Sequence, residues 1–214
     1  LDTHVLEALE KNGAVIHPAP ATVRLIQDKY LQKAFLREHS VPVADFTEVT
    51  STADAKAALK NFGGKMLLKT RHGAYDGRGN MVTQSPADIA KAFALFEGKQ
   101  LYAEAFVPFE RELAVMVARS VDGDVQAYPV VQTIHERNIC VEVLSPAPVP
   151  AAVQEKAHEL AVTVANLLKG AGMYGIEMFL TEAGEVLVNE IAPRVHNSGH
   201  HTTEGNRTSQ FEQH

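Results

Sequence analysis

The stretch KMLLKTRHGAYDGRGN, residues 65–80, decides how this chain is interpreted. It starts as a short apolar run that carries Lys69 near its end. It continues into a segment with three glycines, an aspartate, a tyrosine and two arginines. Glycine bends the backbone easily, and converging backbone N–H groups form concavities that bind anions. We therefore expect a buried strand followed by a phosphate-binding loop, with an ordinary mobile surface loop as the alternative.

Two familiar phosphate-binding loops do not fit this stretch. The Walker loop ends in Gly-Lys-Ser/Thr, whereas Gly79 is followed by Asn80. The kinase loop comes before its strand lysine, whereas Lys69 comes before the glycines. The order predicts a different device, in which the lysine comes first and the loop folds back over the same phosphates.

The composition limits the possible partners. The chain has 214 residues, 45% hydrophobic and 21% charged, which suits one large domain or two small ones. A net charge of −6 without a basic block argues against a nucleic-acid partner. No apolar run approaches the roughly 20 residues that span a bilayer, and no signal peptide opens the chain, so no membrane partner is expected. The single cysteine, Cys140, fits a reducing compartment, and we expect a cytoplasmic protein.

Hydrophobic patterning predicts an α+β fold with antiparallel sheets. Helices are expected at residues 28–39, 53–62, 87–98 and 150–170. Ser51 or Thr52 and then Ser85 are placed to cap the second and third of these. Strands are expected at residues 45–51, 65–70, 80–84, 100–107, 111–120, 124–133, 174–180 and 185–192. A hairpin turn is expected at residues 121–123.

Two glutamates near the end of the chain suggest a metal site. If Ala183-Gly184 is the hairpin turn, counting outward pairs Glu182 with Glu185, Phe179 with Val188, and Glu177 with Glu190. Like charges directly opposite each other destabilise a sheet, and a divalent cation bound by both carboxylates would compensate. Mg²⁺ prefers one or two carboxylates together with substrate phosphates. The alternative is a loop longer by one residue, which would place the two glutamates on opposite faces.

At this point the motifs resemble a known family. They are Lys29, Lys69 and the stretches at residues 73–80, 104–115, 128–135, 175–180 and 188–202. From about Pro18 to its last residue the chain is similar to ATP-grasp ligases, and within them to N5-carboxyaminoimidazole ribonucleotide synthetases of purine biosynthesis. The resemblance implies an ATP-grasp fold that holds a nucleotide between two subdomains, with ATP and Mg²⁺ as cofactors. It also implies a carbon–nitrogen ligase that carboxylates aminoimidazole ribonucleotide with bicarbonate through carboxyphosphate, releasing ADP and phosphate.

The resemblance also implies a role for each matching residue. Lys29 and Lys69 would hold the α- and β-phosphates. The loop over the triphosphate would consist of Ala74, Tyr75, Asp76, Gly77, Arg78, Gly79 and Asn80. The linker that reads the adenine edge would be Glu104, Ala105, Phe106 and Val107, and Glu112 would bind the ribose. His135 would lie near the phosphates, and Glu177 and Glu190 would hold Mg²⁺ beside Asn189. Tyr75, Arg194, His196, Asn197 and Ser198 would face the substrate and carboxyphosphate, with Arg194, His196 and Asn197 catalytic.

Several of these residues have plainer interpretations. Lys29 fits a solvated helix lysine, His135 a core histidine and Arg194 a mobile surface arginine. Glu112 could pair with Arg111 or Arg119 on a strand surface. His196, His200 and His201 suggest zinc, but no upstream partner has the ligand spacing of a zinc site. Planar Arg194 suits a carboxylate or phosphate better.

The resemblance also sets expectations for organisation and for rival functions. Residues 1–20 would end a preceding Rossmann-like domain, 21–107 would form the small ATP-grasp subdomain and 108–214 the large one, cut short at its end. The full-length protein would be a homodimer. The alternatives are a formate-using ATP-grasp ligase of the purine pathway and a non-catalytic nucleotide-binding domain.

Overall fold

Antiparallel sheets and helices make up the structure, a computed structural model that describes residues 2–73 and 79–214, so the predicted α+β class is confirmed. The chain divides into two units. The first comprises Gln27–Pro108 together with Arg137–Ile139, and the second contains the other described residues. Within the described ranges, no helix combines the length and apolar character needed to cross a membrane.

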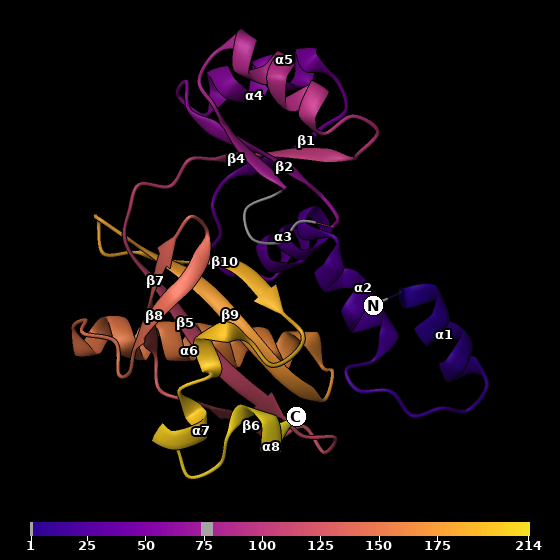
Figure 1. The fold of residues 1–214 in the computed structure, drawn as a ribbon, viewed down its shortest axis with the longest axis vertical. Helices are drawn as coiled ribbons and strands as arrows, with labels where there is room; N and C mark the ends of the chain where they lie inside the picture. Colours follow the sequence, from indigo (N-terminus) through magenta and orange to yellow (C-terminus); the bar gives the residue numbers. More distant parts are fainter. Residues whose placement is uncertain (1, 74–78) are drawn as a thin grey trace. The chain divides into compact units, whose positions relative to one another are not determined.

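The first unit is built on a four-stranded antiparallel sheet in the order β1-β4-β2-β3. Its elements are α3 (Lys29–Glu38), β1 (Phe46–Val49), α4 (Thr52–Asn61), β2 (Met66–Thr70), β3 (Asn80–Thr83), α5 (Pro86–Leu95) and β4 (Leu101–Ala105). Helices α4 and α5 lie on one side of the sheet and α3 on the other (Figure 1). The core on the α4–α5 side contains Met66 and Leu68 from β2 with Ala55, Ile89 and Ala92 from the helices.

Local sequence signals account for the ends of these helices. Ser51 caps α4: its hydroxyl accepts from the Asp54 N–H at 3.1 Å, and the Asp54 carboxylate accepts from the Ser51 N–H at 2.9 Å. Ser85 caps α5, since its hydroxyl accepts from the Asp88 N–H at 3.2 Å, ahead of Pro86 in the first turn. Gly64 follows α4 with a φ of 89°, a conformation that glycine adopts without strain.

The second unit is built on a six-stranded sheet in the order β10-β9-β5-β7-β8, with β6 also paired to β5. Its strands are β5 (Phe109–Arg119), β6 (Val125–Ala127), β7 (Val131–Glu136), β8 (Ile139–Leu144), β9 (Gly172–Thr181) and β10 (Val186–Ala192). Its helices are α1 (Thr3–Lys11), α2 (Pro20–Gln27), α6 (Ala151–Leu168), α7 (Thr202–Gly205) and α8 (Gln210–Gln213), with the 3-10 turn η1 (Asn197–Gly199).

Register separates the two faces of this sheet. Opposed residues share a face, so Leu113 lies with Met178, and Val115 with Ile176. These four side chains are buried. Helix α6 packs along β5 and β9 (Figure 1), and the residues of α6 that are buried are all apolar. The alternate positions, which include Glu112 and Glu177, occupy the opposite face. The predicted site residues Glu112 and Glu177 therefore lie on the face away from α6.

The predicted strand at residues 124–133 is interrupted. The turn at residues 121–123 forms as expected, and β6 pairs with β5 after it. The chain then leaves the ladder around Tyr128 and Pro129, and β7 resumes pairing with β5 in a register shifted by one residue. Proline has no N–H for the ladder, which accounts for the break at this point.

Candidate functional site

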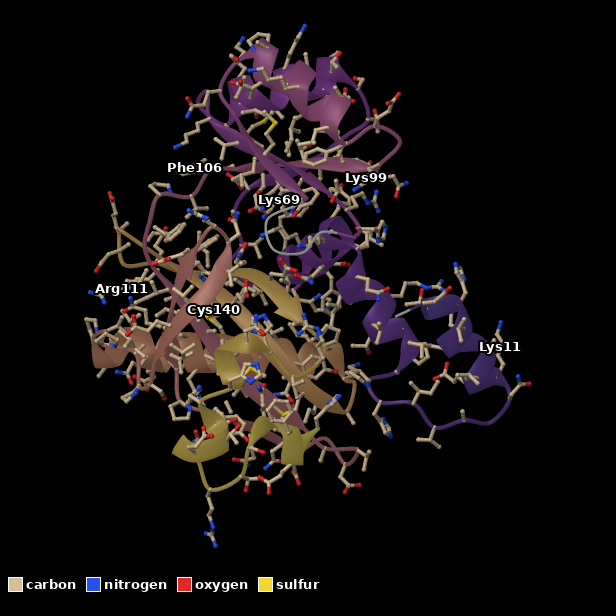
Figure 2. The ribbon with its side chains drawn as sticks, in the orientation of Figure 1. Lys11, Lys69, Lys99, Phe106, Arg111 and Cys140 are labelled. Atoms are coloured by element: carbon tan, nitrogen blue, oxygen red, sulfur yellow. The ribbon has the colours of Figure 1, made fainter. Side chains whose placement is uncertain are left out.

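Lys69, near the end of β2, belongs to a buried charge cluster in the first unit (Figure 2). Its Nζ donates to Glu104 Oε1 at 3.0 Å, and Glu104 Oε2 lies 2.9 Å from Lys33 Nζ on α3. Burial alone would raise the pKa of Glu104, but Lys33 and then Lys69 outweigh it, and the pKa is lowered overall. Glu104 is therefore a carboxylate held between two ammonium groups. Lys33 is absent from the predicted site residues, although it lies four residues after Lys29 on the same helix.

Arg71 fixes the start of α3 to the sheet. Asp28 caps this helix, accepting from the Tyr30 and Leu31 N–H groups at 3.1 Å each. Arg71 Nε donates to both oxygens of Asp28 at 3.1 Å, and Arg71 Nη2 reaches Asp28 Oδ2 at 2.5 Å. Burial of Asp28 would raise its pKa, but the Arg71 contact leads the effects that lower it overall. The Lys29 N–H also donates to the Arg71 carbonyl at 2.9 Å. Arg71 therefore holds the first residue of α3, Lys29, in position through both its side chain and its backbone.

The glycine-rich stretch connects β2 to β3. Lys69 pairs with Asn80 in the ladder, and the Thr70 N–H donates to the Gly79 carbonyl at 2.8 Å, so the two ends of the loop are joined. Ala74, Tyr75, Asp76, Gly77 and Arg78 lie outside the described residues. Their predicted contacts with the triphosphate, and that of Tyr75 with the substrate, remain predictions.

The predicted adenine linker begins at the end of β4. Glu104 and Ala105 are the last residues of this strand, and Phe106 and Val107 follow it. Lys65 Nζ lies 3.4 Å from the centre of the Phe106 ring, a cation–π contact that positions this side chain (Figure 2). The three residues after Glu104 are half-buried.

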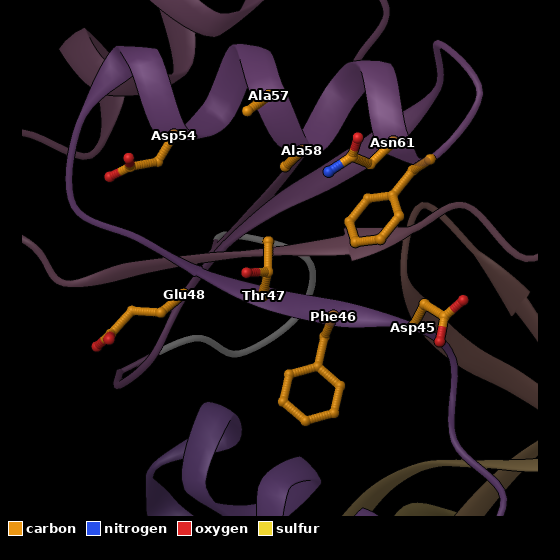
Figure 3. A pocket seen from close by; sticks show the side chains of 9 residues that line it. Asp45, Phe46, Thr47, Glu48, Asp54, Ala57, Ala58 and Asn61 are labelled. Carbon is orange, nitrogen blue, oxygen red and sulfur yellow. The ribbon is translucent and has the colours of Figure 1, made fainter.

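A separate pocket of about 340 Å³ lies between β1 and α4 in the first unit (Figure 3). Its lining residues are Asp45, Phe46, Thr47, Glu48, Asp54, Ala57, Ala58, Asn61 and Phe62. Three of them are acidic and none is basic, so the pocket would repel a phosphate. It does not compete with the lysine cluster as a nucleotide site.

In the second unit, Glu177 and Glu190 face each other across β9 and β10, as predicted. The predicted turn is wrong, because Phe179 pairs with Leu187, not Val188, and Thr181 and Glu185 close a loop one residue longer than expected. A bulge between Val188 and Glu190 adds one residue to β10, and this cancels the one-residue shift in register that the longer loop introduces. The extra residue is Asn189. The longer loop was the alternative expected to separate the two glutamates, and the bulge keeps them together.

The oxygen atoms around this bulge fit a magnesium ion. Glu177 and Glu190 offer carboxylates, and the buried Asn189 Oδ1 has no hydrogen-bond partner among the described residues. A buried acceptor without a donor is costly unless another ligand satisfies it. Across the described ranges, no group of three or more His, Cys, Asp or Glu side chains could hold a metal by itself. Two carboxylates that leave positions for phosphate oxygens are what Mg²⁺ prefers.

Glu112 and His135 form an ion pair on neighbouring strands. His135 Nδ1 lies 2.5 Å from Glu112 Oε2, and this contact is the main reason that the pKa of His135 is raised. The proposed partners Arg111 and Arg119 instead contact Gln132 and the Lys169 carbonyl. The structure thus brings together two residues that the resemblance assigned separately, to ribose and to phosphate.

His196 lies over the sheet because residue 175 is a glycine. A Cβ at Gly175 would come within 2.7 Å of the His196 Cβ. His196 Nε2 lies 3.3 Å from Glu177 Oε1, and His196 Nδ1 lies 2.9 Å from Ser198 Oγ. Burial lowers the pKa of His196 to about 4, and Arg194 acts in the same direction. At neutral pH the imidazole is therefore uncharged.

Gln210, a residue that the sequence analysis did not select, holds His196 in place. Its Oε1 accepts from the His196 N–H, and its Nε2 donates to the His196 carbonyl, both at 2.9 Å. Gln210 is fully buried, and its own N–H donates to Thr202 Oγ1 at 2.9 Å. One side-chain amide thus satisfies both backbone groups of His196.

The other predicted substrate-side residues differ in exposure. Arg194 and Asn197 are exposed, and Arg194 Nη1 donates to the Val195 carbonyl at 2.8 Å. Ser198 is buried, and its hydroxyl faces His196 and the Met116 sulfur. His200 packs near Phe211 and His201 Nδ1 contacts the Ser198 carbonyl, so the imidazoles considered for zinc make separate contacts.

The chain is similar to known proteins along its whole length. The family model for the ATP-grasp domain matches residues 34–211. A phosphoribosylaminoimidazole carboxylase from Ogataea methanolica is 48% identical, over 100% of this chain and 40% of that protein. The crystal structure of carboxyaminoimidazole ribonucleotide synthase from Aspergillus clavatus complexed with ATP gives a TM-score of 0.95 at 39% identity, covering 100% of this chain and 56% of that one. A second Aspergillus clavatus structure, of N5-carboxyaminoimidazole synthase with ADP and 5-aminoimidazole ribonucleotide, gives 0.92 at 37% identity with the same coverage. The chain thus spans about half the length of these relatives.

Proposed function

This chain belongs to the ATP-grasp family, and from that premise we propose that it is the ATP- and magnesium-binding part of an enzyme that carboxylates 5-aminoimidazole ribonucleotide. The names of the similar proteins support this substrate, and the ligands in the two Aspergillus clavatus structures support the nucleotide. Because the chain covers only part of each relative, the activity is proposed for the longer protein.

The observation that carries the proposal is the opposed pair Glu177 and Glu190 beside the bulge at Asn189. In the proposal these two carboxylates hold Mg²⁺, with Asn189 next to them. When bound, Mg²⁺ neutralises negative charge that develops on phosphate oxygens during phosphoryl transfer. His196 contributes a neutral N–H beside Glu177, which orients this carboxylate without competing for the cation.

The first unit supplies the groups for the nucleotide. Lys29 and Lys69 bind its α- and β-phosphates, and residues 74–80 cover the triphosphate. The backbone of residues 104–107 reads the adenine edge. Backbone N–H and C=O groups recognise a base edge only when they are held in fixed positions. The buried strand β4 holds the start of this linker in place.

The second unit supplies the groups for ribose, bicarbonate and the amine. Glu112 accepts from ribose hydroxyls, and His135, whose pKa the contact with Glu112 raises, lies near the phosphates. Arg194 and Asn197 are exposed and present donors to bicarbonate and to the transferred phosphoryl group. Hydrogen-bond donors that are fixed before charge develops are the main source of rate enhancement in such sites.

The reaction proposed for the longer protein has three steps. A bicarbonate oxygen attacks the γ-phosphorus of ATP, the bond to the β-phosphate oxygen breaks, and ADP leaves. The resulting carboxyphosphate breaks into CO₂ and phosphate. The exocyclic amine of the ribonucleotide then attacks the CO₂ carbon and loses one proton, giving the carbamate.

The test is an ADP-release assay on the full-length protein. ATP and Mg²⁺ are supplied with bicarbonate or with formate, each with and without aminoimidazole ribonucleotide. We expect ADP release that requires bicarbonate and rises with the ribonucleotide. Release that requires formate would favour the other ligase, and nucleotide binding without turnover would favour a non-catalytic domain.

A further inference from the structure

Ser198 places its hydroxyl against the ring of His196. Ser198 is 1% exposed, so this hydroxyl is enclosed by the protein. Its Oγ lies 2.9 Å from His196 Nδ1 and 3.7 Å from the Met116 sulfur. A hydroxyl has one hydrogen to donate, and a thioether sulfur is a weak acceptor. The contact with the imidazole is therefore the stronger one, and it remains to find which partner supplies the hydrogen.

The backbone of Ser198 identifies the donor. Its N–H also donates to His196 Nδ1, at 3.4 Å, and a backbone N–H can only donate. Nδ1 is thus an acceptor, and the Ser198 hydroxyl donates to the same atom. The single hydrogen of the neutral imidazole is then on Nε2, which lies 3.3 Å from Glu177 Oε1. In the opposite tautomer a bare nitrogen would face a carboxylate oxygen, and two acceptors would repel each other.

The ring of His196 is already fixed in place by other residues. Gln210 holds the His196 backbone through two hydrogen bonds of 2.9 Å. Gly175 admits the side chain close to the sheet, because a Cβ there would come within 2.7 Å of the His196 Cβ. A ring held in this way presents Nε2 to Glu177 in either tautomer. The position of its one hydrogen therefore decides whether this contact attracts or repels.

We propose that Ser198 is a positioning residue that keeps the hydrogen of His196 on Nε2, so that this N–H holds Glu177 in the orientation that binds Mg²⁺. Residues that donate hydrogen bonds to a metal-binding side chain orient it and strengthen metal binding. The resemblance assigned Ser198 to the substrate, whereas this inference gives its hydroxyl a partner within the protein. The inference rests on the proposed magnesium-binding role of Glu177.

His201 provides a reference for the opposite tautomer. Its Nδ1 lies 3.0 Å from the Ser198 carbonyl, which can only accept, so Nδ1 of this ring carries the hydrogen. Burial lowers the pKa of His201, so its ring is also uncharged at neutral pH. Two neutral imidazoles in one short segment should therefore carry their hydrogens on different nitrogens.

The first measurement is ¹⁵N NMR of the histidine rings in the metal-free full-length protein at neutral pH. A ring nitrogen that carries a hydrogen differs clearly in chemical shift from one that does not, and His196→Gln identifies the signals of that ring by their loss. We expect the hydrogen on Nε2 of His196 and on Nδ1 of His201. Ser198→Ala should shift the tautomer ratio of His196 toward Nδ1–H by about tenfold and leave His201 unchanged.

The second measurement is a calorimetric titration of Mg²⁺ in the presence of a non-hydrolysable ATP analogue. We expect Ser198→Ala to weaken Mg²⁺ binding by about tenfold. Met116→Leu should change neither the tautomer nor the affinity, because it removes the weak acceptor and keeps the contact between Ser198 and His196. Thr83→Val removes another buried hydroxyl, on β3, and should also change neither quantity.

The outcomes separate this inference from the proposed function. Hydrogen on Nδ1 of His196 in the parent would overturn the inference, and this spectrum is decisive even if Ser198→Ala does not fold. A folded Ser198→Ala variant that keeps the parent's tautomer would also overturn it. A shifted tautomer with unchanged Mg²⁺ affinity would overturn the link to Glu177. A parent that has the expected tautomer but binds no Mg²⁺ with the analogue would instead contradict the proposed function.

Discussion

Glu177 and Glu190 stand opposite each other in the ladder of β9 and β10, and the bulge at Asn189 sets this register. Two like charges at opposed positions weaken a sheet by up to about 1 kcal/mol. His196 offsets part of this by placing Nε2 at 3.3 Å from Glu177. A cation that binds both carboxylates would relieve the remainder, so this part of the sheet should respond to magnesium more than any neutral strand pair.

The first prediction concerns this pair in the absence of metal. The double variant Glu177→Gln with Glu190→Gln should melt at the same temperature as the parent or higher in the presence of a chelator, because the repulsion is removed. Adding Mg²⁺ with a non-hydrolysable ATP analogue should raise the melting temperature of the parent but not of the variant. The measurement is thermal unfolding followed by circular dichroism. A chelator-treated variant that melts several degrees lower would contradict the model of opposed carboxylates.

The second prediction tests the close approach of His196 to the sheet. Gly175→Ala would place a Cβ 2.7 Å from the His196 Cβ, so the turn that Gln210 holds would have to move. We expect a loss of about 1–3 kcal/mol in the free energy of unfolding, together with a loss of ADP release. Both are measured on the full-length protein, by urea unfolding and by the turnover assay.

Gly205→Ala is the matched control for this change. Its added Cβ would meet the His201 ring at 4.0 Å, which is an ordinary contact. We expect no loss of stability or activity from this variant. Equal effects of the two substitutions would mean that the close packing of His196 on Gly175 has no special importance.

The sequence was sufficient for the features that depend on neighbouring residues. The caps at Ser51 and Ser85, the strand that carries Lys69 and the turn at residues 121–123 each depend on short patterns, and all are present. The opposition of Glu177 and Glu190 was also predicted, but through two errors that cancel. Neither the three-residue loop before Glu185 nor the bulge after Val188 has a local signal strong enough to fix its length.

The features that were missed depend on contacts between distant parts of the chain. Lys33 meets Glu104 from another element, and nothing in a helical pattern distinguishes a lysine that will be buried from one that will be solvated. Gln210 reaches His196 across fourteen positions. Arg71 belongs to the quoted glycine stretch, yet its carboxylate partner Asp28 lies 43 positions earlier. Side chains of this kind are identified by tertiary geometry alone.

The third prediction uses the ion pair of Glu112 and His135. The pair raises the pKa of His135 above its ordinary value of 6.5. The stabilisation is therefore complete below pH 6.5 and is lost as the pH rises through the raised pKa. In metal-free protein without nucleotide, Glu112→Gln should lower stability at about pH 6 and change it little at about pH 9.

This prediction is checked by urea unfolding across the pH range and by NMR titration of the His135 ring. Glu110→Gln is the control, because Glu110 lies on the same strand and pairs with Arg111 at 3.1 Å. Its effect should be similar at about pH 6 and about pH 9, since this pair contains no histidine. A Glu112→Gln effect that is equally independent of pH would show that His135 is not charged by its partner.

The last prediction concerns Arg194, and it separates carboxylation from simple nucleotide binding. Arg194 is exposed, follows Pro193 at the end of β10, and lies two residues before the clamped His196. Proline cannot continue the ladder at this point. The Gln210 side chain holds the backbone at His196, two residues further on. The exposed Arg194 side chain is therefore attached to a backbone that is fixed on both sides. Arginine presents a planar fork of donors that matches carbonate and phosphoryl oxygens, whereas lysine offers a point charge. Arg194→Lys in the full-length protein should therefore bind Mg-ATP almost normally but lose bicarbonate-dependent ADP release by about 100-fold.

Arg207→Lys, at an exposed arginine between α7 and α8, should change neither quantity. If turnover survives in Arg194→Lys while ATP affinity falls, Arg194 binds the nucleotide and the bicarbonate pocket must be sought elsewhere.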